Sequence, residues 1–501
     1  MIGLLIQDNA YEQDIRELLM SFYPGETYAR EVKEDVDFYV QTQLENGEAS
    51  IGIWDKPEEK EMKEADKSAL KMSAPEGLKD WNLSCFSLGQ ADLSDHSATK
   101  NVIKKLFYQM LVKRTGHELP WGSLTGIRPT KIALSRLEAG WKEEEIRSFM
   151  KETYMTSDEK IDLSIEIAAR EKRLMEPVDY NRGYSLYVGI PFCPTTCLYC
   201  SFTSYPISKW KGRTGLYLEA LFKELEYTAE KMKGRPLDTI YFGGGTPTSL
   251  PAEDIDAILC KLEQLFDTKN VLEFTVEAGR PDSITEEKLK VLASHGISRI
   301  SINPQTMNQK TLDLIGRRHT VENVKEKFHM ARELGFDNIN MDLIMGLPEE
   351  NLDDVKHTLE EIEALRPDSL TVHSLAIKRA ARLNMFKEEY GDLKISNTPE
   401  MIALSEACAR RMGMEPYYLY RQKNMAGNFE NVGYSLPGKA CLYNILIMEE
   451  LATIVACGAG TTTKVVFPSE NRRERCENVK EVEQYINRVD EMIGRKEKIL
   501  N

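Results

Sequence analysis

From residue 184 onward, short apolar segments alternate with amphipathic helical segments along the chain. Six apolar runs have the length and the β-branched content of buried strands. The predicted strands are 185–190, 238–245, 272–279, 298–305, 338–346 and 369–376. Strands that alternate with helices form a parallel sheet through right-handed crossovers. Six such units fall short of a closed eight-stranded barrel, so the pattern predicts an open, partial (β/α)6 barrel.

The N-terminal part of the chain has a different pattern, in which strand signals precede a long helical region. The pattern predicts a strand at 1–7, an amphipathic helix at 10–23 and a hairpin at 37–55 around Asn46-Gly47. A charge run at 56–67 is interpreted as a solvent-exposed segment. Helical patterns dominate the remainder, so we expect an α+β domain.

These patterns divide the chain into three predicted domains, because 501 residues are too many for one ordinary core. Residues 1–180 form the α+β domain, whose role the sequence does not indicate. Residues 181–385 form the barrel, and residues 386–501 form a mainly helical extension that covers the barrel mouth. The expected fold class is therefore α/β, with a partial barrel at its centre.

The charge of the chain limits its partners. The formal net charge is −15 at pH 7, which disfavours general binding to nucleic acid or anionic membranes. No window approaches the ~20 apolar residues of a membrane span. The first apolar run is short and soon meets acidic residues, unlike a signal peptide. We therefore expect a cytoplasmic monomer with no nucleic-acid partner.

One loop, directly after the first predicted barrel strand, carries Cys193, Cys197 and Cys200 in the spacing C-x3-C-x2-C. Four thiolates close a [4Fe–4S] cluster, so three leave one iron open to bind a small molecule and pass it an electron. A structural zinc site takes four ligands, and no second Cys pair follows. Nine cysteines, an odd number, disfavour a disulfide framework. We interpret the others as free thiols: Cys85, Cys260, Cys408, Cys441, Cys457 and Cys476.

The wider phrase Y-x-x-I-P-F-C-x-x-x-C-x-Y-C, at 187–200, resembles the signature of the radical S-adenosylmethionine (SAM) enzymes. It is similar to one branch of them, the oxygen-independent coproporphyrinogen III oxidases and their relatives. This resemblance spans roughly 184 to 465. The stretches PWGSLTGIRPTK (120–131) and NFENVGYSLPG (428–438) also resemble the HemZ-type subgroup of coproporphyrinogen dehydrogenases.

A glycine-rich turn, Gly243-Gly244-Gly245-Thr246-Pro247, follows the second predicted barrel strand. Glycines let the backbone approach a ligand closely, and free N–H and C=O groups can bind a small zwitterion. The resemblance implies that this turn holds the methionyl amino group of SAM. It also implies a [4Fe–4S] cluster and one SAM molecule, or two.

The implied contacts of the first SAM are Tyr187, Gly244 and Glu277. Those of the second are Gly245, Thr246, Gln305, Arg317 and Asp342. The segment Gly458-Ala459-Gly460 resembles one that closes over SAM in these enzymes. Most of these positions lie at the C-terminal ends of predicted strands, where the working residues of such barrels gather.

The resemblance further implies oxidative decarboxylation of coproporphyrinogen III propionates to vinyl groups, which yields protoporphyrinogen IX for haem biosynthesis. The substrate is then a tetrapyrrole, and an unidentified low-potential donor supplies electrons. Lys378, Arg379 and Arg382 follow the sixth predicted strand, where cations could dock propionates. A solvated helix start explains these three cations equally well.

Two positions depart from the oxidase pattern. Phe202 stands where the oxidase has a further cysteine, and Gly189 stands where it has a histidine. A haem-trafficking chaperone of the same superfamily shares the Cys-x-Phe ending, but the region 417–440 contains no histidine to bind haem iron. The alternatives are a haem carrier, another radical SAM enzyme such as a methylase, and a structural iron–sulfur or zinc protein.

Overall fold

The computed structural model describes residues 1–56, 72–126, 128–202, 204–378, 380–422, 425–470 and 472–500. They form two compact units, Met1–Ile165 and Glu166–Asn501. The predicted charge run lies, except for Lys56, outside the described residues. The division into domains at 1–180, 181–385 and 386–501 stays a prediction.

The first unit contains a five-stranded sheet. Its strands, in the order in which they lie side by side, are β2 (Tyr28–Ala29), β1 (Ile2–Ile6), β3 (Phe38–Glu45), β4 (Glu48–Asp55) and β5 (Asn82–Gln90). The first three are parallel, and the last two continue the sheet antiparallel. The predicted hairpin is confirmed, because Asn46 (φ 51°) and Gly47 (φ 77°) join β3 to β4 with the positive φ of a type I′ turn.

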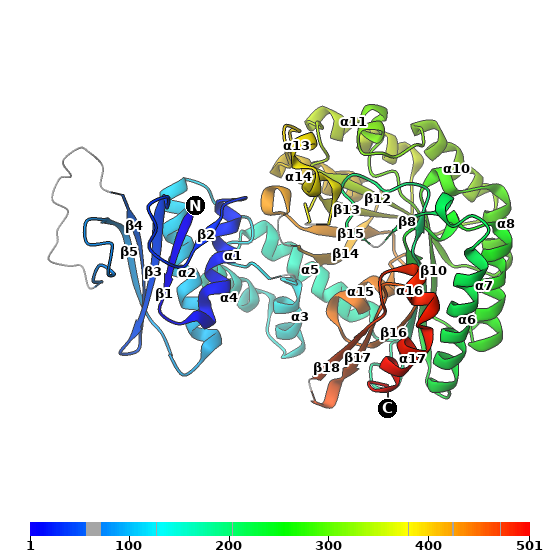
Figure 1. Cartoon of the computed structure of the whole chain (residues 1–501), viewed down its shortest axis with the longest axis horizontal. Helices are drawn as coiled ribbons and strands as arrows, with labels where there is room; N and C mark the ends of the chain where they lie inside the picture. The colour runs from blue at the N-terminus through cyan, green and yellow to red at the C-terminus, as the bar shows by residue number, and fades with distance from the viewer. Residues whose placement is uncertain are drawn as a thin grey trace. The chain divides into compact units, whose positions relative to one another are not determined.

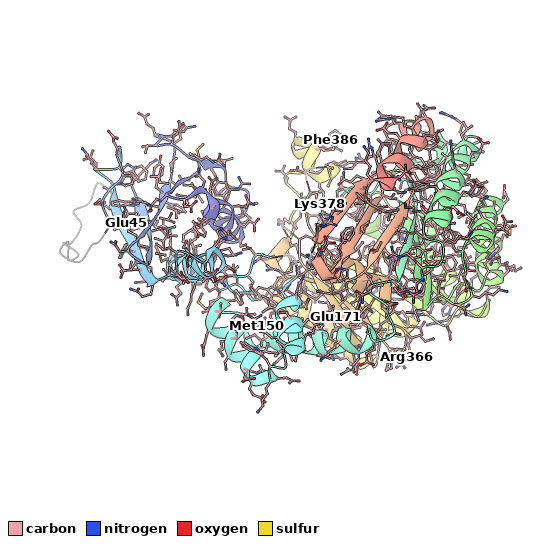
Figure 2. All side chains as sticks on the ribbon, turned by 90° about the horizontal axis from the view of Figure 1, so that it is seen from below. Glu45, Met150, Glu171, Arg366, Lys378 and Phe386 are labelled. Carbon is pink, nitrogen blue, oxygen red and sulfur yellow. The ribbon has the colours of Figure 1, made fainter. Side chains whose placement is uncertain are left out.

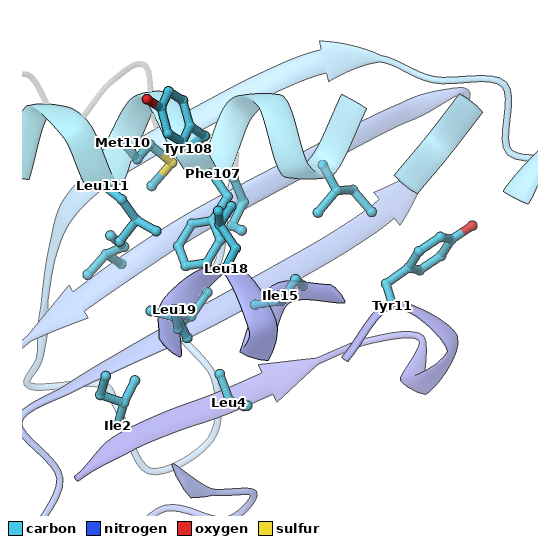
Figure 3. Packing of buried hydrophobic residues seen from close by; sticks show 14 of the residues in the cluster. Ile2, Leu4, Tyr11, Ile15, Leu18, Leu19, Phe107, Tyr108, Met110 and Leu111 are labelled. Atoms are coloured by element: carbon cyan, nitrogen blue, oxygen red, sulfur yellow. The ribbon is translucent and has the colours of Figure 1, made fainter. Parts of the chain in front are cut away.

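Two helices pack on this sheet and form the core of the first unit (Figure 3). Leu18 and Leu19 of α1 (Glu12–Phe22) and Phe107 of α2 (His96–Thr115) are fully buried. The predicted helix at 10–23 is thus confirmed. Two further helices, α3 (Thr130–Glu138) and α4 (Glu143–Tyr154), complete the α+β unit.

The second unit is built on an eleven-stranded sheet (Figure 1). Its strands, in spatial order, are β14 (Glu415–Tyr420), β15 (Asn431–Ser435), β13 (Ser369–Ser374), β12 (Ile339–Met345), β11 (Arg299–Ile302), β10 (Glu273–Gly279), β9 (Leu237–Gly244), β6 (Tyr184–Ile190), β16 (Thr453–Cys457), β17 (Thr462–Phe467) and β18 (Arg472–Glu477). All six predicted strands are confirmed, and neighbours from β6 to β13 are parallel. Their residues are almost all buried, as in a sheet covered on both faces.

Helices connect successive barrel strands and lie along their outer side (Figure 1). They are α6 (Thr214–Lys231), α7 (Ala252–Leu265), α8 (Glu286–Ser294), α9 (Gln309–Leu314), α10 (Val321–Glu333) and α11 (Leu352–Leu365). Another helix, α5 (Asp158–Leu174), precedes β6. Among the helices that the structure describes, none combines the length and apolar character needed to cross a bilayer.

The sequence predicts a mainly helical region from residue 386 onward. After the short helix α12 (Arg382–Met385), the structure contains the helices α13 (Lys387–Tyr390), α14 (Pro399–Arg411), α15 (Leu442–Glu449), α16 (Val482–Asn487) and α17 (Val489–Glu497). It adds five strands, β14 to β18, which join the barrel sheet at both ends. Of these, β16 pairs parallel with β6, the strand that leads into the cysteine loop.

A buried charged cluster joins α6 to the C-terminal segments. Glu224 accepts hydrogen bonds from the backbone N–H of Gly458 (2.7 Å), Asn478 Nδ2 (2.7 Å) and the Tyr485 hydroxyl (2.5 Å). It also pairs with Lys496 Nζ, and both side chains of this pair are fully buried. A buried charge is tolerated only when it is paired and hydrogen-bonded. These contacts therefore fix α16, α17 and the turn at Gly458 against the barrel.

Candidate metal centre

The three cysteines lie in a pinned loop at the C-terminal end of β6. Cys193 ends the short strand β7 (Phe192–Cys193), which pairs with β8 (Tyr205–Pro206) and so closes the loop at its base. Inside the loop, the Cys200 N–H donates to the Cys197 carbonyl (3.2 Å). Cys193 and Cys197 are buried, and Cys200 is half-buried. The β7–β8 pair and this hydrogen bond thus hold the three predicted ligands together at the C-terminal end of β6.

The number and protonation of these thiols restrict what they can bind. A structural zinc site takes four ligands, whereas this loop supplies three thiols, the number that leaves one iron of a [4Fe–4S] cluster open. Burial raises the pKa of Cys193 to about 11 and also raises the pKa of Cys200. The thiolate is the form that binds a metal, so a bound cation must stabilise the negative charge that burial disfavours.

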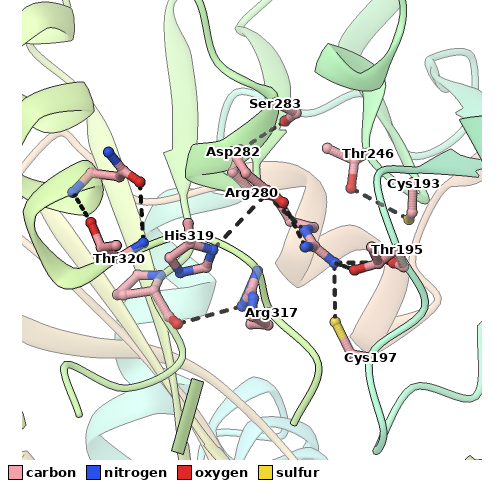
Figure 4. A network of polar contacts seen from close by, with 12 residues as sticks. Cys193, Thr195, Cys197, Thr246, Arg280, Asp282, Ser283, Arg317, His319 and Thr320 are labelled. Carbon is pink, nitrogen blue, oxygen red and sulfur yellow. Dashed lines mark hydrogen bonds and ion pairs between the residues drawn. The ribbon is translucent and has the colours of Figure 1, made fainter. Parts of the chain in front are cut away.

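A buried arginine contacts the cysteine loop, and sequence reasoning missed it (Figure 4). Arg280 Nη1 donates to Cys197 Sγ (3.5 Å) and to Thr195 Oγ1 (2.8 Å). Its other nitrogens hold the Asp282 carboxylate in a two-pronged ion pair at 2.9 and 2.7 Å. Arg280 is only 3% exposed. The available signal was the sequence Arg-Pro-Asp immediately after the predicted strand 272–279.

The glycine-rich turn packs directly on the cysteine loop. A Cβ on Gly245 would lie 2.6 Å from the Phe192 carbonyl oxygen and 3.0 Å from Cys193 Sγ, so glycine is required there. Thr246 Oγ1 lies 3.4 Å from the same sulfur. The expectation of free N–H groups is wrong for Gly245 and Thr246, because they donate to the carbonyls of Ile190 (2.6 Å) and Phe192 (2.7 Å). These bonds instead fix the turn to the loop.

Tyr187 and Glu277, the predicted contacts of the first SAM, lie near each other beside this turn. The Tyr241 hydroxyl donates to Glu277 Oε1 (2.6 Å), and the rings of Tyr187 and Tyr241 stack with centroids 5.9 Å apart. The ring of Tyr443 stacks on both. The backbone of Gly244, which has φ 114°, also bonds to Glu277. Burial raises the pKa of Glu277 to about 7.

Gln305, Arg317 and Asp342 form a second local group. The Gln305 N–H donates to the Asp342 carbonyl (2.9 Å), and Arg317 Nη1 donates to the carbonyl of Pro304 (3.5 Å). Gln305 has φ 69°, a left-handed conformation that few non-glycine residues adopt. Arg317 is 3% exposed, yet its Nε finds no hydrogen-bond partner among the described residues. A buried donor of this kind fits an anionic ligand.

The structure shows the surroundings of Gly189 and Phe202, the two residues that depart from the oxidase pattern. A Cβ on Gly189 would lie 2.4 Å from Thr461 Cγ2, because the turn at Gly458 packs on the end of β6. Histidine would not fit there. Phe202 is 71% exposed, and Lys378 Nζ lies 5.5 Å from the centre of its ring.

Of the two other cations predicted to dock propionates, Arg379 and Arg382, the structure describes Arg382. Arg379 lies outside the described residues. Arg382 begins α12, and its guanidinium carbon is 5.9 Å from the ring centre of Phe386. Phe386 and its neighbour Met385 are both exposed. Figure 2 labels Lys378 and Phe386 on the ribbon of this unit.

Comparison with known proteins agrees with the resemblance found in the cysteine loop. A model of the radical SAM superfamily matches residues 187–362. The chain is 43% identical over 428 residues to the oxygen-independent coproporphyrinogen-III oxidase-like protein HemZ of Bacillus subtilis, covering 85% of each chain. It is 34% identical over 244 residues to the heme chaperone HemW of the same species, covering 48% of this chain and 63% of that relative.

Among solved structures, the coproporphyrinogen III oxidase HemN of Escherichia coli, a radical SAM enzyme, has a similar fold. The TM-score is 0.50 at 24% identity, covering 62% of this chain and 70% of that one. The likeness confirms the predicted partial barrel.

Proposed function

We infer that this chain, which belongs to the family of HemZ-type, coproporphyrinogen oxidase-like radical SAM proteins, oxidatively decarboxylates propionate side chains of coproporphyrinogen III. Each propionate loses a hydrogen atom, CO2 and one electron, and a vinyl group remains. The electron passes to a separate redox partner. The observation that carries the radical chemistry is the three-cysteine loop at the C-terminal end of β6.

The cofactors of this superfamily are a [4Fe–4S] cluster and SAM. The residues present fit them: three thiols are grouped in one loop, and the buried Nε of Arg317 has no hydrogen-bond partner among the described residues. When bound, these cofactors supply the one-electron chemistry that removes a hydrogen atom from an unactivated carbon. In this proposal Cys193, Cys197 and Cys200 hold the cluster.

The residues of the chain position SAM and exclude water. Tyr187, Gly244 and Glu277 would contact the first SAM, with Glu277 accepting hydrogen bonds from its ribose hydroxyls. Gln305, Arg317 and Asp342, with Gly245 and Thr246, would contact the second. Because the N–H groups of Gly245 and Thr246 already donate to protein carbonyls, their contacts must come from other atoms.

A substrate with anionic side chains is supported by the Lys378–Phe202 contact. Phe202 is exposed two residues after Cys200, and the Lys378 ammonium group lies over its ring. The individual pyrrole rings of a porphyrinogen can pack against an aromatic side chain, and the Lys378 ammonium group can pair with a propionate. Loss of Lys378 should therefore weaken substrate binding more than SAM binding.

A haem carrier is the second candidate. Its support is the Phe202 at the oxidase cysteine position and the 34% identity to a heme chaperone. The absence of histidine from 417–440 weighs against it.

An anaerobic assay with SAM, dithionite and coproporphyrinogen III distinguishes the candidates. The decarboxylase should release 5′-deoxyadenosine and CO2 and form a vinyl product, all of them absent with Cys197→Ala. Production of 5′-deoxyadenosine without CO2 contradicts the proposal. Stoichiometric haem uptake would favour the carrier, and transfer of a labelled methyl group from SAM would reveal a methylase.

SAM binding should weaken as the pH falls below 7. The pKa of Glu277 is raised to about 7 mainly by burial, with Asp342 also raising it and Tyr241 and Arg299 lowering it. Its carboxylate therefore exists above pH 7 and is protonated below. We expect up to tenfold weaker SAM binding per pH unit, about the limit for one titrating group. Anaerobic equilibrium dialysis between pH 8 and 6 measures this.

The matching variant, Glu277→Gln, should bind SAM about 10- to 100-fold more weakly at pH 8, because a charged hydrogen bond is lost. Its affinity for SAM should no longer depend on pH. The exposed Glu287→Gln is the control and should retain the wild-type profile. A flat profile in the wild type would contradict the assignment of Glu277.

A further inference from the structure

A second group of metal-ligating side chains lies on α7 and α8, away from the cysteine loop. Asp256 and Cys260 are one turn apart on α7, and His295 is the C-cap of α8. One ligand atom of each lies within 4.8 Å of the other two. In the part of the chain that the structure describes, no other three His, Cys, Asp or Glu side chains meet in this way.

The distances place one carboxylate between an imidazole and a thiol. His295 Nε2 lies 3.0 Å from Asp256 Oδ1, and Cys260 Sγ lies 4.0 Å from Asp256 Oδ2. Zinc takes nitrogen, oxygen and sulfur ligands at about 2.0–2.3 Å in tetrahedral sites. Such bonds bring ligand atoms to roughly 3–4 Å from one another, so small side-chain rotations suffice.

A fourth side chain orients the histidine. Glu263 Oε1 lies 2.8 Å from His295 Nδ1, which leaves Nε2 directed at Asp256. Metal-bound histidines commonly donate their other N–H to a carboxylate, which fixes the ring. A protonated His295 between two carboxylates explains the same two contacts, but it assigns no role to the Cys260 thiol.

We propose that Asp256, Cys260 and His295 bind one zinc ion, with Glu263 holding the His295 ring and the fourth position open to solvent. Because His295 lies between α8 and the start of β11, the ion sits near the N-terminal ends of the strands. The cysteine loop lies at the opposite, C-terminal ends. The zinc ion therefore links α7 to α8 and takes no part in the reaction.

Zinc content and zinc X-ray absorption test this on the full chain with its cluster reconstituted. After dialysis, the wild type should retain about one zinc ion, with one sulfur near 2.3 Å and the remaining ligands near 2.0 Å. Zinc bound to Cys260→Ser should lack the sulfur. His295→Gln should lose most of its zinc, and Glu263→Gln should bind it about 10- to 100-fold more weakly.

Matched controls separate this site from the cluster cysteines. Cys85→Ser, at a half-buried cysteine of the first unit, should keep wild-type zinc. Iron content should be unchanged in every variant, which shows that each has folded. Wild-type protein without retained zinc, zinc bound by two or more sulfurs, or equal zinc in the wild type and His295→Gln would overturn the proposal.

Discussion

Anaerobically reconstituted protein carrying Cys197→Ala is expected to lose its cluster iron and to produce no 5′-deoxyadenosine. Three thiolates are the fewest that hold a [4Fe–4S] cluster while leaving one iron open. Cys197 is buried and accepts a hydrogen bond from Arg280, so no solvent ligand can readily replace it. Iron analysis, the cluster absorption and product chromatography measure the loss.

The matched control is Cys408→Ala. Cys408 is also buried, but it lies on α14, and its thiol donates to the backbone carbonyl of Leu359 at 3.6 Å. This variant should retain wild-type iron and SAM cleavage, with a small loss of stability from the cavity. Full iron content in Cys197→Ala would show that the loop does not hold the cluster as assigned.

Replacing Arg280 with glutamine is expected to lower the reduction potential of the cluster. A cationic N–H donated to a ligand sulfur stabilises the reduced, more negative cluster, and hydrogen bonds to sulfur are among the groups that set such potentials. Losing a charged hydrogen bond should shift the potential by about 60–120 mV, or ten- to hundredfold in a one-electron equilibrium. A potentiometric titration followed by electron paramagnetic resonance measures the shift.

Two further variants make this result specific. Arg280→Lys keeps the charge but not the planar fork that also grips Asp282, so it should give an intermediate shift. Arg488→Gln removes an arginine that is 41% exposed and paired with Glu491, and it should leave the potential unchanged. An unaltered potential in Arg280→Gln, with full iron content, would refute the tuning role.

The barrel strands could be predicted from sequence because each is a nearly continuous apolar run that is buried on both sides. The edge strand β18 (Arg472–Glu477) could not. It consists mostly of charged residues, since it is the edge of the sheet and its outer positions face solvent. Lys464 on β17 and Arg475 on β18 both pair with Glu450, and no local pattern shows such pairing.

The same limit applies to the metal centre. The short spacing of Cys193, Cys197 and Cys200 made the cysteine loop recognisable. The contact of Arg280 with Cys197 joins segments far apart in the sequence, so only the fold shows it. The hydrogen bonds of Gly245 and Thr246 to β6 and β7 likewise depend on the register of neighbouring strands.

The pairing of β16 with β6 bears on when iron can be delivered to the newly made protein. During translation, β6 and its cysteines leave the ribosome long before residues 453–457 are synthesised to become their outer neighbour. Gly189 meets Thr461, and Glu224 meets Lys496, later still. Until these segments are made, β6 lacks its neighbour β16 and the cysteine loop lacks the contacts that support it from the C-terminal region. Stable cluster insertion is therefore expected to follow synthesis of the segment 453–496.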